Sequence, residues 1–286
     1  MDSGSYVKAV EGLKVEGLIV MRHGKRIAEH RWIPEAPRNV FSVSKSFTSI
    51  AVGMAVDEGK LSLGDKVLEA FPGMVKDPSP RLKALTLEQL LTMTRGHGEF
   101  SRPNSVEEAL NQDLVHEPGE LFIYDNGSTF LASAMFTRAA GKTVRDYLVE
   151  KLFRPLGIPD PEWEESDDGY TRGATGLRIS TSSMALFGQF LLQRGEWQGK
   201  QLVSAGWIDS AGRAQVTTKD SHHADYDLGY GYCFWPCRHG AYRADGKDGQ
   251  FVIVLPRQDV VIAINSDEEN MKPILYAVWD HLLPGL

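Results

Sequence analysis

Strand-like segments stand at both ends of this chain and helix-like segments fill the middle, which leaves few folds open to it. Short β-branched or aromatic runs bounded by turn residues predict strands at 18–21, 26–30, 230–235, 240–244, 250–255 and 260–265. Apolar residues that recur at three- and four-residue steps predict helices at 43–58, 86–93, 105–112, 128–140, 144–152, 182–194 and 271–283. Strands so far apart in sequence can share one core by pairing in a single sheet.

We therefore predict an α+β fold, in which an antiparallel sheet built from both chain termini is flanked by helices and a mostly helical domain is inserted between its halves. The predicted boundaries place residues 1–41 and 214–286 in the sheet domain and residues 42–213 in the helical domain. A seam between two such domains is where a binding cleft is expected, so the active site should lie there.

The composition argues against several classes of function. The 286 residues carry a formal net charge of -7, which does not suit a surface that binds DNA or RNA. The longest apolar runs are too short to span a bilayer and the first residues show no secretory signal, so a cytoplasmic protein without membrane contact is expected. Nucleotide-binding and zinc-protease motifs are absent, and Cys233, Cys237 and His239 match no common zinc spacing, so no metal or cofactor is expected.

Ser42 and Lys45 stand three residues apart where the first central helix begins, so their side chains share one face of its first turn. A serine hydroxyl becomes a good nucleophile when a neighbouring base takes its proton, and a lysine can do so when burial lowers its pKa. There is a simpler alternative. Ser-x-x-Lys occurs about once by chance in a chain of this length, Ser5 and Lys8 repeat it, and serine often caps helices.

A second candidate group lies in the loop before the helix at 128–140, where Tyr124 and Asn126 form the one Tyr-x-Asn of the sequence. A tyrosine at a cleft edge can relay protons when a lysine cation lowers its pKa, and an asparagine amide can hydrogen-bond a substrate carbonyl. Asp125, Asn126 and Gly127 also form a strong turn signal, so an ordinary turn is the alternative.

A third group, Ala244-Asp245-Gly246-Lys247, lies between two predicted strands. Its glycine would let a substrate lie against the edge of a strand, and a strand N–H could complete an oxyanion hole with that of Ser42. A tight hairpin is the alternative explanation, because Asp-Gly favours such turns.

Taken in this order, the three groups resemble those of the serine β-lactamase and penicillin-binding-protein superfamily. The likeness is greatest to its class C β-lactamase and carboxylesterase branch, which includes 6-aminohexanoate-dimer hydrolases. Further runs at 59–67, 85–94, 118–120 and 173–180 extend it over residues 17–265. The resemblance implies an α/β sandwich with a helical domain, in agreement with the fold predicted above.

The same resemblance implies a role for each candidate residue. Ser42 would be the acyl-enzyme nucleophile, Lys45 its proton acceptor and Tyr124 a general acid or base. Lys247 would offer its N–H to the oxyanion. The residues implied to contact the substrate are Asn126, Ala244, Gly246 and Lys247.

The third group departs from the β-lactamase pattern, in which a lysine or histidine leads Thr-Gly and its cation helps to hold a substrate carboxylate. Here Ala244 takes that place and Asp245 follows. We therefore expect a serine hydrolase that cleaves a small ester or amide through an acyl-enzyme on Ser42. A D-amino-acid peptidase or weak β-lactamase is one alternative, and a binding or sensor protein without turnover is another.

Other residues have weaker claims to a function. His97 and His116 lie in loops that could touch the cleft, although loop histidines are more often structural or solvated, and the pair at 222–223 is expected at the surface. Three aromatic residues could line an acyl pocket, although strand aromatics usually belong to the core. They are Tyr230, Tyr232 and Trp235.

Overall fold

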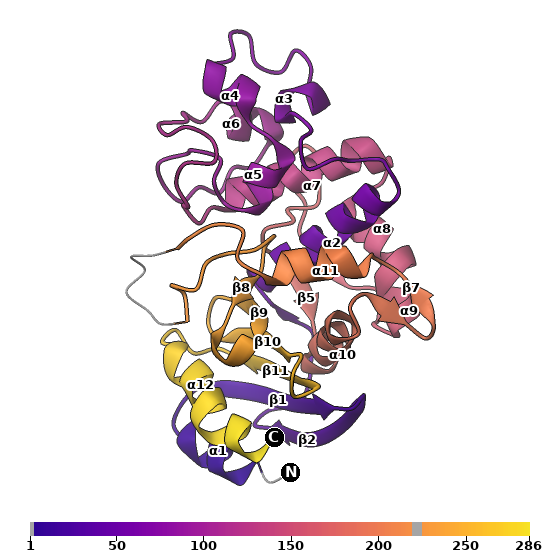
Figure 1. The fold of residues 1–286 in the computed structure, drawn as a ribbon, viewed down its shortest axis with the longest axis vertical. Helices are drawn as coiled ribbons and strands as arrows, with labels where there is room; N and C mark the ends of the chain where they lie inside the picture. Colours follow the sequence, from indigo (N-terminus) through magenta and orange to yellow (C-terminus); the bar gives the residue numbers. More distant parts are fainter. Residues whose placement is uncertain (1–2, 219–224) are drawn as a thin grey trace.

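One six-stranded antiparallel sheet joins the two ends of the chain in a computed structural model that describes residues 3–218 and 225–286. Its strands are β1 (Val15–Arg22), β2 (Lys25–Arg31), β8 (Trp235–Pro236), β9 (Tyr242–Gly246), β10 (Gln250–Leu255) and β11 (Val260–Ser266). They lie in the order β2-β1-β11-β10-β9-β8, and Leu18 of β1 pairs with Ile264 of β11 where the two ends meet. The predicted sheet from both termini is confirmed (Figure 1).

Helices cover both faces of this sheet (Figure 1). On one face lie α1 (Gly4–Ala9), α12 (Lys272–Ala277) and the turns that continue α12, η3 (Val278–Leu282) and η4 (Leu283–Gly285). On the other face α10 (Thr181–Leu192) packs against β11, β10 and β1. Because both faces are covered, every residue of β10 and β11 is buried, which explains their almost continuous apolar sequences. Gly188 permits the close packing of α10, since a Cβ there would lie 2.3 Å from a methyl group of Val261.

The middle of the chain is mostly helical and is organised around α2 (Val43–Asp57) and α7 (Asn126–Ala140), which pack on each other. The shorter helical elements are α3 (Val67–Ala70), α4 (Pro80–Ala84), α5 (Leu87–Leu91), α6 (Val106–Leu110), α8 (Val144–Leu148), η1 (Val149–Phe153), α9 (Arg154–Leu156), α11 (Ala205–Gly212) and η2 (Arg238–Gly240). The short strands are β3 (Arg38–Asn39), β4 (Glu162–Trp163), β5 (Leu177–Ile179), β6 (Glu196–Trp197) and β7 (Lys200–Gln201).

The first turn of α2 lies beside the edge of the main sheet. Helix α2 packs against β9, and Gly246 at the end of that strand approaches the backbone of Val40 so closely that a Cβ would lie 2.3 Å from the Val40 carbonyl oxygen. This approach brings the second half of the chain to the residues just before α2. The division into domains at residues 41/42 and 213/214 stays a prediction.

The strand predicted at 230–235 is wrong over most of its length, because β8 is confined to Trp235–Pro236. Cys233 instead adopts a positive φ of 62°, and its N–H donates to the carbonyl oxygen of Leu91 at the end of α5. A hydrogen bond to a helix distant in sequence therefore overrides the strand preference of this aromatic run.

The predicted helices at 86–93, 105–112 and 144–152 are present with shorter α-helical bounds, while α1, α3, α4, α9 and α11 are not predicted. Each of these is short enough that its apolar residues show no clear helical period. In the described ranges, every helix is too short or too polar to cross a lipid bilayer.

Candidate active site

Ser42 stands at the N-terminal boundary of α2, directly after a residue with an unusual backbone conformation. Phe41 has a positive φ of 46°, a left-handed conformation that costs a residue with a side chain about 1–2 kcal/mol. Its N–H donates to Asn39 Oδ1 at 2.9 Å, which helps to hold this turn. Ser42 occupies the N-cap position, yet its hydroxyl makes no capping hydrogen bond. A helix cap therefore does not account for this serine.

Lys45 is buried in the first turn of α2, with 1% of its surface exposed. Its Nζ lies 3.1 Å from Ser42 Oγ, 2.5 Å from Asn126 Oδ1 and 2.8 Å from the carbonyl oxygen of Ala174. Burial lowers the pKa of Lys45 to about 7, although the negative charge of Asp125 opposes the change. In the neutral amine, two N–H groups can donate to the amide and carbonyl oxygens, which leaves the nitrogen lone pair to face Ser42.

Tyr124 lies beside both residues, with a hydrogen bond to Ser42 and its ring centroid 4.9 Å from Lys45 Nζ. Burial raises the pKa of Tyr124 above its ordinary value, and a hydrogen bond with Ser42 opposes this rise. The expectation that the Lys45 cation lowers this pKa is wrong, because removal of the phenol from water has the larger effect. Tyr124 is thus a neutral hydroxyl in the resting protein, and a neutral hydroxyl can donate a proton.

The start of α7, which holds Tyr124 and Asn126 in place, is anchored by a buried ion pair that no sequence motif indicates. Asp125 Oδ2 lies 2.7 Å from Arg95 Nε, and both side chains are almost fully buried. Burial tends to raise the pKa of Asp125, but the Arg95 charge and hydrogen bonds from Ser101 outweigh it and hold the pKa below its ordinary value. The same carboxylate accepts the Ser128 N–H and so caps α7. The alternative of an ordinary turn is wrong, because Asn126 and Gly127 begin α7, and this capped helix start fixes the two candidate residues.

The third group is divided between the core and the cleft. Ala244 is fully buried in the core, so it presents no side chain to a substrate. Gly246 is required by the close approach of Val40 described above. The Lys247 side chain is 69% exposed, with Nζ 3.7 Å from Asp248. Within the described residues, the backbone N–H groups of Ser42 and Lys247 have no hydrogen-bond partner, so both can donate to an oxyanion.

A cavity of about 510 Å³ brings most of these residues together. From the predicted site it is lined by Ser42, Tyr124, Asn126 and Lys247. It is also lined by Phe41, Phe100, Arg102, Thr175, Tyr226, Trp235, Asp245 and Met271. Trp235 was a predicted lining residue of such a pocket, whereas no sequence motif marks Phe100, Arg102 and Tyr226, which reach the cleft from loops.

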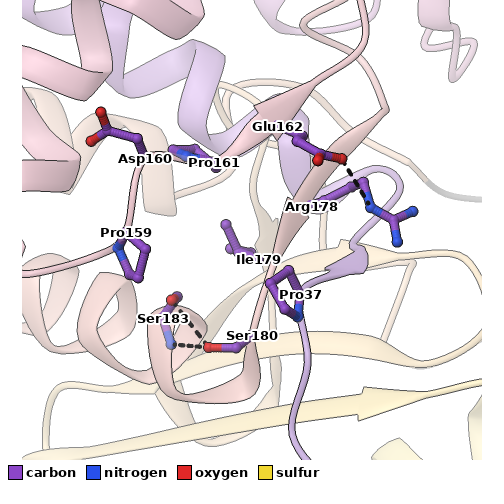
Figure 2. Close-up of a pocket in the computed structure, with 9 residues that line it drawn as sticks. All are labelled: Pro37, Pro159, Asp160, Pro161, Glu162, Arg178, Ile179, Ser180 and Ser183. Carbon is purple, nitrogen blue, oxygen red and sulfur yellow. Dashed lines mark hydrogen bonds and ion pairs between the residues drawn. The ribbon is translucent and has the colours of Figure 1, made fainter.

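A separate cavity of about 340 Å³ lies away from this site, between Pro37, the loop at 159–162 and the start of α10 (Figure 2). Its hydroxyl groups are already engaged, since Ser180 accepts the Ser183 N–H as the cap of α10. Glu162 and Arg178 pair with each other across its edge. It contains no serine next to a lysine, so it offers no acyl-transfer chemistry.

Comparison with known protein families places the chain in one of them. A family model described as "Beta-lactamase" matches residues 9–279, nearly the whole chain. The chain belongs to the β-lactamase family. Its membership confirms the superfamily that the three residue groups resemble.

Relatives of this β-lactamase-family chain are distant. Protein flp of Staphylococcus aureus (strain N315) is 24% identical over 162 residues, which is 52% of this chain and 32% of that protein. Lovastatin esterase of Penicillium rubens is 27% identical over 153 residues, or 43% of this chain and 38% of the esterase. The matches thus span only about a third of the length of these curated relatives.

Solved structures match the β-lactamase-family fold over the whole chain. A protein assigned as a 6-aminohexanoate-dimer hydrolase from Bacillus anthracis gives a TM-score of 0.80 at 19% identity, covering 98% of this chain and 80% of that one. The octameric penicillin-binding protein homologue from Pyrococcus abyssi gives 0.81 at 20% identity, covering 100% and 78%. At these identities the likeness shows the fold, and the chemistry must be argued from the residues.

The remaining candidates lie outside the cleft or outside the described residues. His97 Nδ1 lies 2.9 Å from the Asp113 carbonyl oxygen, and neither His97 nor His116 lines the cavity. The histidines at 222–223 fall outside the described residues. Cys233 and Cys237 are free, buried thiols, and the described residues contain no cluster of three metal-ligand side chains.

Proposed function

We propose that this protein is a cofactor-free serine hydrolase that cleaves a small ester or amide through an acyl-enzyme on Ser42. The observation that carries this proposal is the 3.1 Å contact between Ser42 Oγ and the amine of a buried lysine whose pKa is lowered to about 7, at the wall of a cavity. The substrate would be a small molecule, with neither nucleic acid nor membrane as partner. We also propose that the protein acts in the cytoplasm, in keeping with its two free thiols.

The first half of the reaction forms the acyl-enzyme. Neutral Lys45 takes the proton of Ser42 as Oγ bonds to the substrate carbonyl carbon. The negative charge that develops on the carbonyl oxygen is stabilised by the N–H groups of Ser42 and Lys247. Tyr124 gives its proton to the leaving oxygen or nitrogen as that bond breaks, and regains a proton from the Lys45 ammonium group, so the residues return to their starting charges.

The second half reverses these transfers. Water takes the position of the leaving group, passes a proton to neutral Lys45, either directly or through the Tyr124 hydroxyl, and attacks the acyl carbon. Ser42 recovers its proton from Lys45 as the acid is released. The Asn126 amide, held by the Lys45 contact of its Oδ1, can donate through Nδ2 to the acyl part of the substrate.

The missing cation of the third group bears on the substrate class. Ala244 offers no charge to a substrate carboxylate, and the exposed Lys247 ammonium group pairs with Asp248. This favours a neutral ester or amide over a β-lactam or a D-peptide with a free carboxylate. A D-amino-acid peptidase or weak β-lactamase is the second candidate, favoured by Arg102, which lines the cavity and could take over the missing role.

Hydrolysis of p-nitrophenyl butyrate by wild type and Ser42→Ala, purified in parallel, tests the proposal. We expect many turnovers by wild type, none above background by Ser42→Ala, and an unchanged circular dichroism spectrum. Mass spectrometry of quenched wild type should show an added butyryl group on the peptide that contains Ser42. Equal rates in the two proteins would refute the assignment, whereas a single-equivalent burst would favour a sensor that acylates without turnover.

A further inference from the structure

A second cavity, of about 770 Å³, lies next to the candidate active site. Tyr124 and Trp235 line both cavities, with ring centroids 5.9 Å apart in a stacked arrangement. These two rings therefore form a wall that the Ser42 cavity and the second cavity share. The volume is within the range of cavities that hold a small-molecule ligand.

The second cavity is lined by apolar residues along the segment that leads to Tyr124, and by Thr94, Thr217 and Thr218 as uncharged polar residues. Leu121, Phe122 and Ile123 lead up to Tyr124, and Val216 lies opposite in a separate segment. Phe122 packs edge-on against Trp235 at 5.8 Å, which extends the aromatic wall away from Ser42. Leu121 is 46% exposed. Removing an apolar side chain from water is favourable, so an apolar ligand that covers Leu121 would gain binding free energy.

The two cavities also differ in the charge of the residues that line them. The Ser42 cavity contains Arg102, Asp245 and Lys247, whereas Glu120 is the one charged side chain among the described residues that line the second cavity. Glu120 is exposed, and its carboxylate accepts the Glu117 N–H on the loop. The Glu120 carboxylate is therefore in contact with water and with a backbone N–H. In the described part of this cavity, the surface beside Tyr124 and Trp235 carries no charge and suits an uncharged group.

The position of Tyr124 indicates which part of a substrate enters this cavity. In the proposed function, on which this inference rests, Tyr124 protonates the leaving atom, so that atom must lie at its hydroxyl. The acyl part stays beside Asn126, which lines the first cavity and not the second. We propose that the second cavity holds the leaving group, and that the preferred substrates are esters of extended apolar alcohols with a small acyl part.

Two ester series test this inference in wild type and three variants. The first lengthens the alcohol, from ethyl to hexyl butyrate, and is followed by titration of the released acid. The second lengthens the acyl chain, from p-nitrophenyl acetate to octanoate. The variants Leu121→Gln and Val216→Gln place an amide in the second cavity, whereas Met74→Gln changes an equally exposed apolar residue that lines neither cavity.

We expect kcat/KM of wild type to rise along the alcohol series by up to about fourfold per methylene, the gain typical of burying one such group, and to stay nearly level along the acyl series. Leu121→Gln and Val216→Gln should flatten the alcohol series while leaving ethyl butyrate within about twofold of wild type, and Met74→Gln should match wild type. A level alcohol series, or a rise along the acyl series instead, would overturn the inference while leaving the serine hydrolase proposal intact.

A binding measurement keeps the two proposals distinguishable. Calorimetric titration of Ser42→Ala with 1-hexanol should give saturable binding, weakened about tenfold or more by an added Leu121→Gln substitution. Absence of binding would refute the inference even if hydrolysis is found. Binding without Ser42-dependent hydrolysis of any ester would support an apolar site and refute the proposed function.

Discussion

The ionisation of Lys45 should set the pH dependence of hydrolysis. With a pKa of about 7, Lys45 would be neutral in about 9% of molecules at pH 6, about half at pH 7 and about 91% at pH 8. A lysine with the ordinary pKa near 10.4 would be neutral in only about 0.04% of molecules at pH 7. Burial in α2 thus raises the fraction of active base about a thousandfold. We expect kcat/KM to rise about tenfold between pH 6 and pH 8.

The assay is initial-rate hydrolysis of p-nitrophenyl butyrate from pH 5.5 to 9.5, corrected for the spontaneous reaction. Lys45→Arg is the matched control, because it retains a cation in α2 but cannot accept a proton at these pH values. It should lower kcat by about 10²–10⁴, the usual contribution of a general base. A wild-type profile that is level from pH 6 to 8 and rises only above pH 9 would refute the reasoning, since the base would then have the pKa of a solvated lysine.

The same ionisation has a consequence for stability, with a sign that can be checked. Between about pH 7 and pH 10.4 the unfolded chain binds a proton at Lys45 that the folded protein does not. The burial of Lys45 therefore lowers the free energy of unfolding most at and below about pH 7, and this penalty shrinks as pH rises through the window. Urea denaturation at pH 7 and pH 9 should show the resulting gain in wild type and not in Lys45→Met.

Three further substitutions distinguish residues that act in the reaction from residues that stabilise the fold. Tyr124→Phe should lower kcat by about 10²–10⁴ while leaving the rise near pH 7 in place, so a shifted rise would contradict its role as proton donor. Arg95→Met should lower the free energy of unfolding by about 3–5 kcal/mol in urea, because it leaves a buried carboxylate unpaired. The control Arg81→Met, at an exposed ion pair, should change the free energy of unfolding by less than about 1 kcal/mol. Equal losses in the two variants would argue against Arg95 as the anchor of Asp125. Gly53→Ala should destabilise by about 1–3 kcal/mol, because its Cβ would lie 2.5 Å from an indole ring, whereas Gly206→Ala has open space and should lose nothing in the same thermal denaturation.

Local sequence patterns predicted those features of this protein that depend on residues close together in the chain. The three-residue spacing of Ser42 and Lys45 at a helix start brings the two side chains together in any α-helix, so their contact followed from the sequence. β-branched and aromatic runs at both ends, and helical spacing between them, likewise predicted which segments form strands and which form helices. Each of these depends on geometry within one element, which residue order dictates.

Other features depend on segments that meet only after folding. Arg95 and Asp125 form their ion pair across 30 positions of sequence, and no local rule pairs them. Cys233 leaves the strand conformation because its N–H meets the Leu91 carbonyl. Tyr124 was expected to lose its proton more easily beside a lysine, but its burial raised the pKa instead.

The sequence by itself thus determined the family, the sheet from both termini and the pairing of a serine with a lysine. The tertiary structure decided how completely Lys45 is removed from water and which buried ion pair anchors the start of α7. It also decided which aromatic rings line both cavities. The physical reason is that spacing along a helix or strand brings neighbours together whatever surrounds them. Desolvation and cavity shape, in contrast, depend on every segment that packs around a residue.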